Sequence, residues 1–372
     1  MRKVFYFRHT PIDVDRIMYE KFSSKICNGL TVIADTDFSS ERIKCGYSSI
    51  SEYYSTVILR EIDNKNKFLD ELFENNMDSI YIFNGIGFGR RYIDYIRKYN
   101  IKYYGFIAER DCSVEDNLKE KIKRIFPRLS YLKYRRMLNN CSFFLAMGRS
   151  GIECYKKFGV KTNLLFNFMY NDGNEYHSPI YSNNECARFI YIGRFYNAIK
   201  GTDTLLDALK QIQGPYTFDF VGGYGPDREM IFDEIQKNKY CRFLGTWDSD
   251  DVCNKLNEYD VIVVPSKRDG WNLHNNLSIM AGIGCISSNE TGSEELIEKC
   301  GNGIVFQAGN INELRKAIEY VIYNKDVVDS WKKRTEEFYS KISPEAVSDY
   351  FIEVLKYAIG EIDVRPLEPW SK

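Results

Sequence analysis

The chain has 372 residues, more than one hydrophobic core usually serves, so two domains are expected. Hydrophobic residues make up 44% and charged residues 28%, a globular composition that excludes a disordered or fibrous chain. The formal net charge is −1, so an electrostatic partner has to be sought in local patches. Ten cysteines without a C-x-x-C pair indicate free thiols in a reducing compartment, not a disulfide framework or a zinc site.

The first half of the chain predicts apolar strands with helical patterns between several of them. The expected strands are 3–8, 30–35, 55–60, 79–85, 102–109, 141–147 and 162–168. The N-terminal apolar run is too short for a signal peptide, and no stretch approaches the roughly 18 apolar residues of a spanning helix. We therefore expect a cytoplasmic protein, either free or peripheral on the inner face of the membrane.

The second half alternates strands and amphipathic helices more regularly. Strands are expected at 188–194, 216–225, 241–247, 260–266, 284–288 and 303–306, with helices at 201–212, 228–238, 249–259, 292–300 and 311–324. This alternation predicts βαβ units and a parallel sheet covered on both faces. The predicted domains are 1–170 and 188–342, joined by a linker at 171–187, with a C-terminal helix and tail at 343–372 packing back toward the first domain.

Three strand ends of the second half carry polar or glycine residues. Arg194 ends the first strand and Lys200 precedes the next helix, a pair of cations suited to a diphosphate. Gly222 and Gly223 follow the second strand, where missing side chains admit a ligand or another backbone. Asp269 follows the strand "DVIVVPS" and could accept hydrogen bonds from hydroxyls. Together these ends predict a site for a phosphorylated, hydroxyl-rich ligand such as a nucleotide sugar.

The run "YIGRF…KGTDTLLDAL…FDFVGGYG…DVIVVPSKRDGWNLHNNLSIMAG" resembles the C-terminal domain of the retaining group 1 glycosyltransferases, family 4, over about residues 188–325. The resemblance implies the α/β GT-B fold, in which two doubly wound Rossmann-like domains face each other across a cleft. It also implies donor-binding residues with the following places: Arg194 and Lys200 at the diphosphate, Asp269 at the sugar, and Gly270, Trp271, Asn272, Leu273 and His274 around the helix start.

Two departures from the family pattern concern the donor site. The first acid of the family signature is Asp269 instead of glutamate, one methylene shorter. The second acid, which binds the ribose hydroxyls in the family, falls on Leu277, whose side chain cannot accept a hydrogen bond. Asn275 and Asn276 are either substitutes for it or polar residues near a helix start.

The acceptor side matches the family in architecture more than in residues. His9 ends the first strand, and Glu109 and Arg110 stand where many family members carry a histidine. Residues 89–138 combine many Lys and Arg with aromatic residues, which suits either an anionic membrane surface or a nucleic acid, or is a solvated face.

The predicted activity is retaining transfer of a hexose from a nucleotide diphosphate sugar, with UDP favoured, to an acceptor hydroxyl. Arg194, Lys200 and Asp269 are the predicted catalytic residues, and the expected acceptor is a lipid-linked saccharide of surface polysaccharide biosynthesis. No cofactor and no metal are expected, because the two cations replace a metal. The alternatives are transfer to a nucleic acid base and a degenerate, non-catalytic protein that binds a sugar or a partner.

Overall fold

A computed structural model describes residues 2–11, 16–26, 29–37, 55–111, 125–126, 131–171, 175–181, 186–248 and 251–371. The chain divides into two compact units. Unit 1 contains the described residues up to Asn171 together with Pro344–Ser371, and unit 2 contains those from Glu175 to Ser343. Within the described residues, the chain passes from unit 1 to unit 2 between Asn171 and Glu175 and returns to unit 1 between Ser343 and Pro344.

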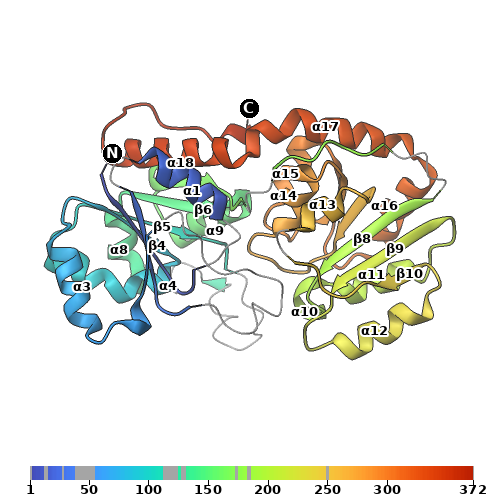
Figure 1. Cartoon of the computed structure of the whole chain (residues 1–372), viewed down its shortest axis with the longest axis horizontal. Helices are drawn as coiled ribbons and strands as arrows, with labels where there is room; N and C mark the ends of the chain where they lie inside the picture. Colours follow the sequence, from blue (N-terminus) through green and yellow to red (C-terminus); the bar gives the residue numbers. More distant parts are fainter. Residues whose placement is uncertain are drawn as a thin grey trace. The chain divides into compact units, whose positions relative to one another are not determined.

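Unit 1 is built on a parallel sheet of seven strands in the order β3-β2-β1-β4-β5-β6-β7 (Figure 1). All seven strands predicted for the first half of the chain are in this sheet. Their bounds are β1 Val4–Arg8, β2 Leu30–Ala34, β3 Ser55–Ile58, β4 Ile80–Asn84, β5 Tyr103–Ala108, β6 Phe143–Met147 and β7 Leu165–Phe168. The central strands are buried at every or nearly every position because helices cover both faces of the sheet.

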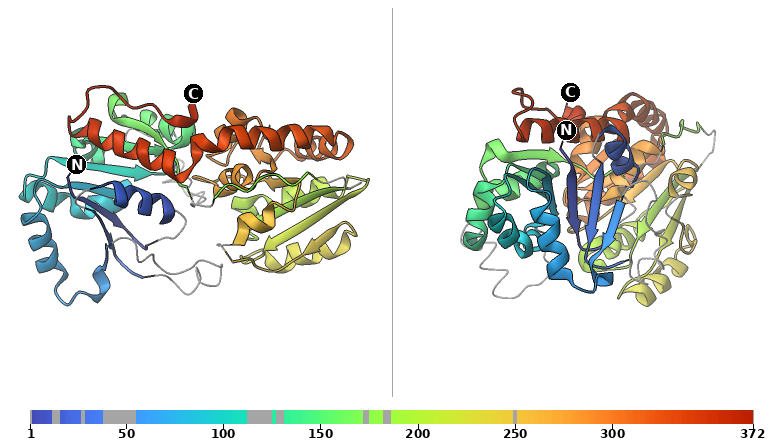
Figure 2. Two further views of the ribbon diagram at one scale, coloured as in Figure 1. Left: turned by 45° about the horizontal axis from the view of Figure 1, so that its top comes forward. Right: turned by 60° about the vertical axis from the view of Figure 1, so that its left-hand side comes forward.

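Helices cover each face of this sheet. The α-helices of unit 1 are α1 Arg16–Lys25, α3 Lys65–Glu74, α4 Ile86–Gly89, α5 Ile93–Lys98, α8 Arg135–Asn140, α9 Gly148–Phe158 and α18 Pro344–Ala358. α18 lies beside α1 (Figures 1 and 2), with the rings of Phe22 and Phe351 stacked at 4.6 Å. Lys25 adds an ion pair to Asp349 at 2.7 Å, so the C-terminal helix is part of the core of unit 1.

Unit 2 contains a parallel sheet of six strands in the order β10-β9-β8-β11-β12-β13. The strands are β8 Ala187–Gly193, β9 Tyr216–Gly222, β10 Cys241–Phe243, β11 Val261–Val264, β12 Gly284–Ser288 and β13 Gly303–Phe306. The helices are α10 Asn197–Lys200, α11 Thr202–Leu209, α12 Arg228–Lys237, α13 Val252–Leu256, α14 Leu273–Met280, α15 Glu294–Cys300, α16 Ile311–Tyr323 and α17 Asp326–Ile342.

Alternate residues of each strand of unit 2 pack on opposite faces. Phe189 and Val261 belong to a cluster with α11, α12 and α16, whereas Ile190 and Ile262 belong to a second cluster with α13, α14 and α15. This is the doubly wound arrangement that the sequence predicts. The chain leaves β8 toward β9 and β10 on one side and returns to β11 on the other, so β8 and β11 flank the switch point of the sheet.

The residues predicted as a linker lie in part against unit 2. The backbone N–H of His177 donates to the carbonyl of Met280 at 2.8 Å, and the Lys332 ammonium donates to the carbonyl of Ile180 at 2.8 Å. Among the described residues, no helix has both the length and the apolar character needed to cross a bilayer. The described cysteines, which are seven of the ten, are all free thiols.

Candidate functional site

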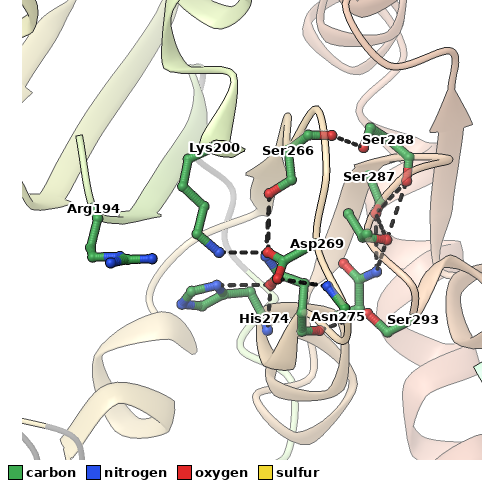
Figure 3. A network of polar contacts seen from close by, with 12 residues as sticks. Arg194, Lys200, Ser266, Asp269, His274, Asn275, Ser287, Ser288 and Ser293 are labelled. Atoms are coloured by element: carbon green, nitrogen blue, oxygen red, sulfur yellow. Dashed lines mark hydrogen bonds and ion pairs between the residues drawn. The ribbon is translucent and has the colours of Figure 1, made fainter. Parts of the chain in front are cut away.

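Three charged side chains of unit 2 lie at the switch point between β8 and β11. In open α/β sheets, ligands bind at this point, beyond the carboxyl ends of the strands. Arg194 follows β8, Lys200 ends α10, and Asp269 lies in the loop after β11. The structure therefore brings the predicted catalytic residues to one edge of one sheet (Figure 3).

Lys200 and Asp269 form the central ion pair. The ammonium Nζ lies 2.5 Å from Asp269 Oδ2, and each side chain is only 17% exposed. Burial opposes ionisation of Asp269, but the Lys200 charge and the hydrogen bonds from Lys200 and Asn272 outweigh it, so the pKa of Asp269 lies below its usual value. The carboxylate is therefore ionised at neutral pH and is available as a hydrogen-bond acceptor.

Asp269 also accepts hydrogen bonds from its own loop. The Asn272 amide donates to Oδ2 at 2.9 Å, the Ser266 hydroxyl donates to Oδ2 at 3.4 Å, and the Gly270 N–H donates to Oδ1 at 3.2 Å. Its backbone N–H donates to the carbonyl of Glu290 in the loop after β12 at 2.9 Å. Contacts on several sides hold the carboxylate in one orientation, which a recognition site requires.

A glycine, Gly201, allows the loops after β8 and β11 to pack closely against each other. Gly201 has a φ of +64°, and a Cβ there would lie 2.1 Å from the Pro265 carbonyl oxygen. Only glycine permits this approach, which brings Lys200 against the end of β11. The N–H of Lys267 donates to the carbonyl of Ile199 at 2.8 Å and closes the same contact.

The loop after β12 packs on the Asp269 loop in a similar way. A Cβ on Gly292, whose φ is +78°, would lie 2.0 Å from the carbonyl oxygen of Gly270. The N–H of Asn272 donates to the carbonyl of Thr291 at 2.9 Å, and the Ser293 hydroxyl donates to the carbonyl of Asn272 at 2.7 Å. This contact occupies the N–H of Asn272, and α14 begins at the next residue, Leu273.

Arg194 differs from Lys200 in having its head group exposed. Within the described ranges, no hydrogen bond or ion pair is found for its guanidinium. In the view of Figure 3 this group lies on the same side of Asp269 as Lys200 and the His274 ring. An exposed guanidinium can take a phosphate group without first breaking an internal ion pair.

His274 lies in the first turn of α14. Its Nδ1 is 3.0 Å from Asn272 Oδ1. Burial, reinforced by the Lys200 charge, lowers the pKa of His274 to about 4, so the ring is neutral at pH 7. Trp271, its neighbour in the predicted donor set, is buried.

Gly222, the last residue of β9, and Gly223 contact protein instead of open space. A Cβ on Gly222 would lie 2.5 Å from the carbonyl oxygen of Gly193, and one on Gly223 would lie 2.9 Å from the ring of Phe243. The sequence left two explanations for glycine at position 222, the approach of a ligand and the approach of another backbone. The structure shows the approach of another backbone, that of Gly193.

Leu277 and the two asparagines before it are internal. Leu277 is 7% exposed and packs in the apolar cluster with α13 and α15. Asn275 is fully buried and donates to the hydroxyls of Ser287 and Thr291 at 3.0 and 3.1 Å, which contradicts its use as a substitute ribose ligand. Asn276 is also fully buried. Position 277 therefore serves the core of unit 2.

The acceptor-side candidates all lie in unit 1. His9 follows β1, is 69% exposed, and has Nδ1 3.4 Å from a carboxylate oxygen of Asp35, which also accepts a hydrogen bond from Arg91 at 2.6 Å. Glu109 and Arg110 follow β5 at the same carboxyl edge of the sheet. Of the basic segment 89–138, residues 112–124 and 127–130 lie outside the described residues.

Sequence reasoning did not assign Ser266 or the residues of the loop after β12 to the site. Asn272 carries a local signal of the helix start, since asparagine directly before a helix is a frequent N-cap. Its side chain accepts from the N–H of His274 at 3.0 Å. No group of three or more His, Cys, Asp or Glu with metal-binding geometry occurs among the described residues.

Part of the chain, including the site, is similar in sequence to known glycosyltransferases. Residues 186–324 match the family described as "Glycosyl transferases group 1". An uncharacterized glycosyltransferase of Methanocaldococcus jannaschii is 26% identical over 181 residues, which are 47% of this chain and 49% of the relative. The match to this curated relative thus spans about half of its length.

Solved structures match nearly the whole chain. Anabaena HepE in complex with UDP and glucose has a TM-score of 0.73 at 12% identity and is similar over 96% of this chain and all of that one. The lipopolysaccharide outer core galactosyltransferase WaaB has a TM-score of 0.67 at 14% identity, over 97% of this chain and 99% of that one. Sucrose-phosphate synthase from Thermosynechococcus elongatus has a TM-score of 0.72 at 14% identity, over 97% of this chain and all of that one. The fold of the chain is therefore GT-B, as the sequence predicts.

Proposed function

We propose, from the match of residues 186–324 to group 1 glycosyltransferases and from the GT-B fold, that the chain transfers a sugar from a nucleotide diphosphate sugar to an acceptor hydroxyl. The observation that carries this proposal is the position of the Lys200–Asp269 network, which lies inside the matched segment and at the switch point of unit 2. UDP is the favoured nucleotide because HepE, a structural neighbour, was solved with UDP and glucose.

The roles of the site residues follow from their charge and exposure. The exposed Arg194 guanidinium and the Lys200 ammonium bind the diphosphate, and the Leu273 N–H at the start of α14 adds a donor. Asp269, which is ionised and already oriented, accepts a hydrogen bond from a hydroxyl of the sugar. Lys200 then has two anionic partners, Asp269 and the diphosphate.

We propose retention of configuration at the sugar, as the family resemblance implies. The acceptor oxygen forms a bond to the anomeric carbon on the face from which the diphosphate departs, while the bond from that carbon to the phosphate oxygen breaks. The departing diphosphate oxygen takes the proton of the acceptor hydroxyl, so no enzyme nucleophile is consumed. Arg194 and Lys200 stabilise the negative charge that develops on the leaving group, and transfer is proposed to need no metal.

The proposed acceptor is a lipid-linked saccharide, and the sugar is a hexose. The structural similarity to WaaB, a galactosyltransferase of the lipopolysaccharide outer core, supports both parts of this proposal. Residues 89–138 are proposed to contact an anionic membrane surface through their basic and aromatic side chains.

A thermal-shift panel with UDP-, GDP-, ADP- and TDP-sugars tests the donor part of the proposal. We expect a rise in melting temperature with one nucleotide class, UDP, and the same rise in the presence of EDTA. The anomeric configuration of the product, read by NMR, tests retention. If the protein binds no nucleotide sugar, the transferase proposal is wrong and a non-catalytic binding protein is favoured.

A further inference from the structure

Asn272 connects the Asp269 carboxylate to His274. Its Nδ2 donates to Asp269 Oδ2 at 2.9 Å, and its Oδ1 accepts from the backbone N–H of His274 at 3.0 Å. An ionised carboxylate can only accept, and a backbone N–H can only donate. The orientation of the Asn272 amide is therefore fixed at both of its ends.

This orientation determines which nitrogen of His274 carries the proton. Asn272 Oδ1 also lies 3.0 Å from His274 Nδ1. Because Oδ1 is an acceptor, Nδ1 must donate and so must be protonated. In a neutral imidazole the other nitrogen, Nε2, then carries a lone pair and accepts hydrogen bonds.

The surroundings of Nε2 indicate what it binds. In the part of the chain that the structure describes, no hydrogen bond is found for Nε2. The charged groups that act on the ring are Lys200 and Asp269. In the view of Figure 3 the His274 ring lies on the same side of Asp269 as Arg194. A lone pair in this position repels a phosphate oxygen but suits the O–H group of a sugar.

We infer that His274 Nε2 accepts a hydrogen bond from a hydroxyl group of the bound donor sugar, beside the hydroxyl that Asp269 binds. The inference rests on the proposed function and assigns the specificity for one further hydroxyl to His274. Asn272 acts as a positioning residue, because its amide is oriented by the Asp269 carboxylate and in turn orients the His274 imidazole. Two acceptors linked by one amide would distinguish sugars by the placement of two hydroxyls.

The variants His274→Asn and His274→Gln separate the two ring nitrogens. The amide of asparagine reaches the position of Nδ1 and keeps the contact to Asn272, but it has no atom at Nε2. The longer glutamine places an amide atom near Nε2. Calorimetric titration of the intact chain with UDP, UDP-glucose, UDP-galactose and UDP-N-acetylglucosamine compares them with the wild type.

We expect His274→Asn to weaken binding of the preferred UDP-sugar by about fivefold to tenfold, the effect of one hydrogen bond, and to change UDP binding less than about twofold. His274→Gln should recover part of the loss. A preferred-sugar analogue that lacks the recognised hydroxyl should bind both the wild type and His274→Asn equally. Equal weakening of UDP and UDP-sugar, or no weakening of either, would overturn the inference.

Titration in two buffers of different ionisation enthalpy gives a readout that a merely structural role would not move. A neutral Nε2 acceptor predicts no proton uptake when the UDP-sugar binds at pH 7. Uptake of a proton that disappears in His274→Asn would mean that His274 donates to phosphate, and the inference would be wrong. If the wild type binds none of the UDP-, GDP-, ADP- and TDP-sugars of the thermal-shift panel, the proposed function itself fails, which distinguishes the two failures.

Discussion

Replacement of Lys200 by methionine removes the cation that lies 2.5 Å from the Asp269 carboxylate and leaves a side chain of similar length. Removing one partner of a fully buried ion pair costs about 3 to 5 kcal/mol, because the other charge stays buried without compensation. Here Asp269 keeps 17% exposure and its hydrogen bonds from Asn272, Ser266 and Gly270. We therefore expect Lys200→Met to lower the free energy of unfolding by about 2 kcal/mol.

Urea unfolding followed by tryptophan fluorescence measures this change, since three of the four tryptophans, Trp247, Trp271 and Trp331, are in unit 2. Lys316→Ala on α16 is the matched control, because it removes an exposed positive charge from the same unit. The double variant Lys200→Met with Asp269→Asn removes the uncompensated carboxylate, and it should recover at least half of the lost stability but none of the lost UDP affinity.

The pH dependence of the Lys200→Met effect checks its cause. The pKa of Asp269 in the folded chain lies below its ordinary value of 3.8, so the ion pair contributes stability above that ordinary value and loses it as the pH falls through the folded pKa. The stability difference between wild type and Lys200→Met should be full at pH 7 and shrink below about pH 4. Equal stability of the two proteins at pH 7, or a double variant no more stable than Lys200→Met, would refute the reasoning.

Three further substitutions test separate parts of the site. Arg194→Ala should weaken UDP binding by about tenfold to a hundredfold, the loss of a charge-assisted contact, while urea unfolding stays within about 0.5 kcal/mol of wild type; unchanged UDP binding would contradict the diphosphate role. Gly201→Ala should destabilise unit 2 by about 2 kcal/mol or more, because its Cβ would lie 2.1 Å from the Pro265 carbonyl oxygen, and a variant as stable as wild type would show that this contact is not needed. Leu277→Glu restores the second acid of the family signature but buries a charge in the apolar cluster, so we expect lower stability at pH 7 than for Leu277→Met and no gain in UDP affinity; tighter UDP binding would show that the side chain reaches the ribose.

Most strands could be predicted because parallel strands covered on both faces are continuous apolar runs. The seven strands of unit 1 follow such runs, as β1 and β6 show with every residue buried. β10 was predicted too long, over 241–247, but it ends at Phe243. The chain turns at Gly245, whose φ of +79° lies outside the extended region. Because Leu244 is apolar, the apolar pattern of the sequence continues past the end of the strand.

The site was predictable where it depends on strand ends and less so where it depends on contacts between loops. Arg194, Lys200 and Asp269 could be grouped because the carboxyl ends of parallel strands meet at one edge of the sheet. The hydrogen bond from the Asp269 N–H to the Glu290 carbonyl depends on how the loops after β11 and β12 pack, which no local pattern encodes. The burial of Asn275 likewise follows from its contacts with Ser287 and Thr291, twelve and sixteen residues away.

The central claim is that a nucleotide sugar binds at the switch point of unit 2. Hydrogen exchange of the intact wild-type chain with and without saturating UDP-glucose, or the UDP-sugar that gives the largest thermal shift, locates the bound donor directly. We predict slower exchange in the peptides that cover residues 194–201 and 265–276, where Arg194, Lys200 and the start of α14 lie. Unchanged exchange in both segments while the donor is bound would contradict the account.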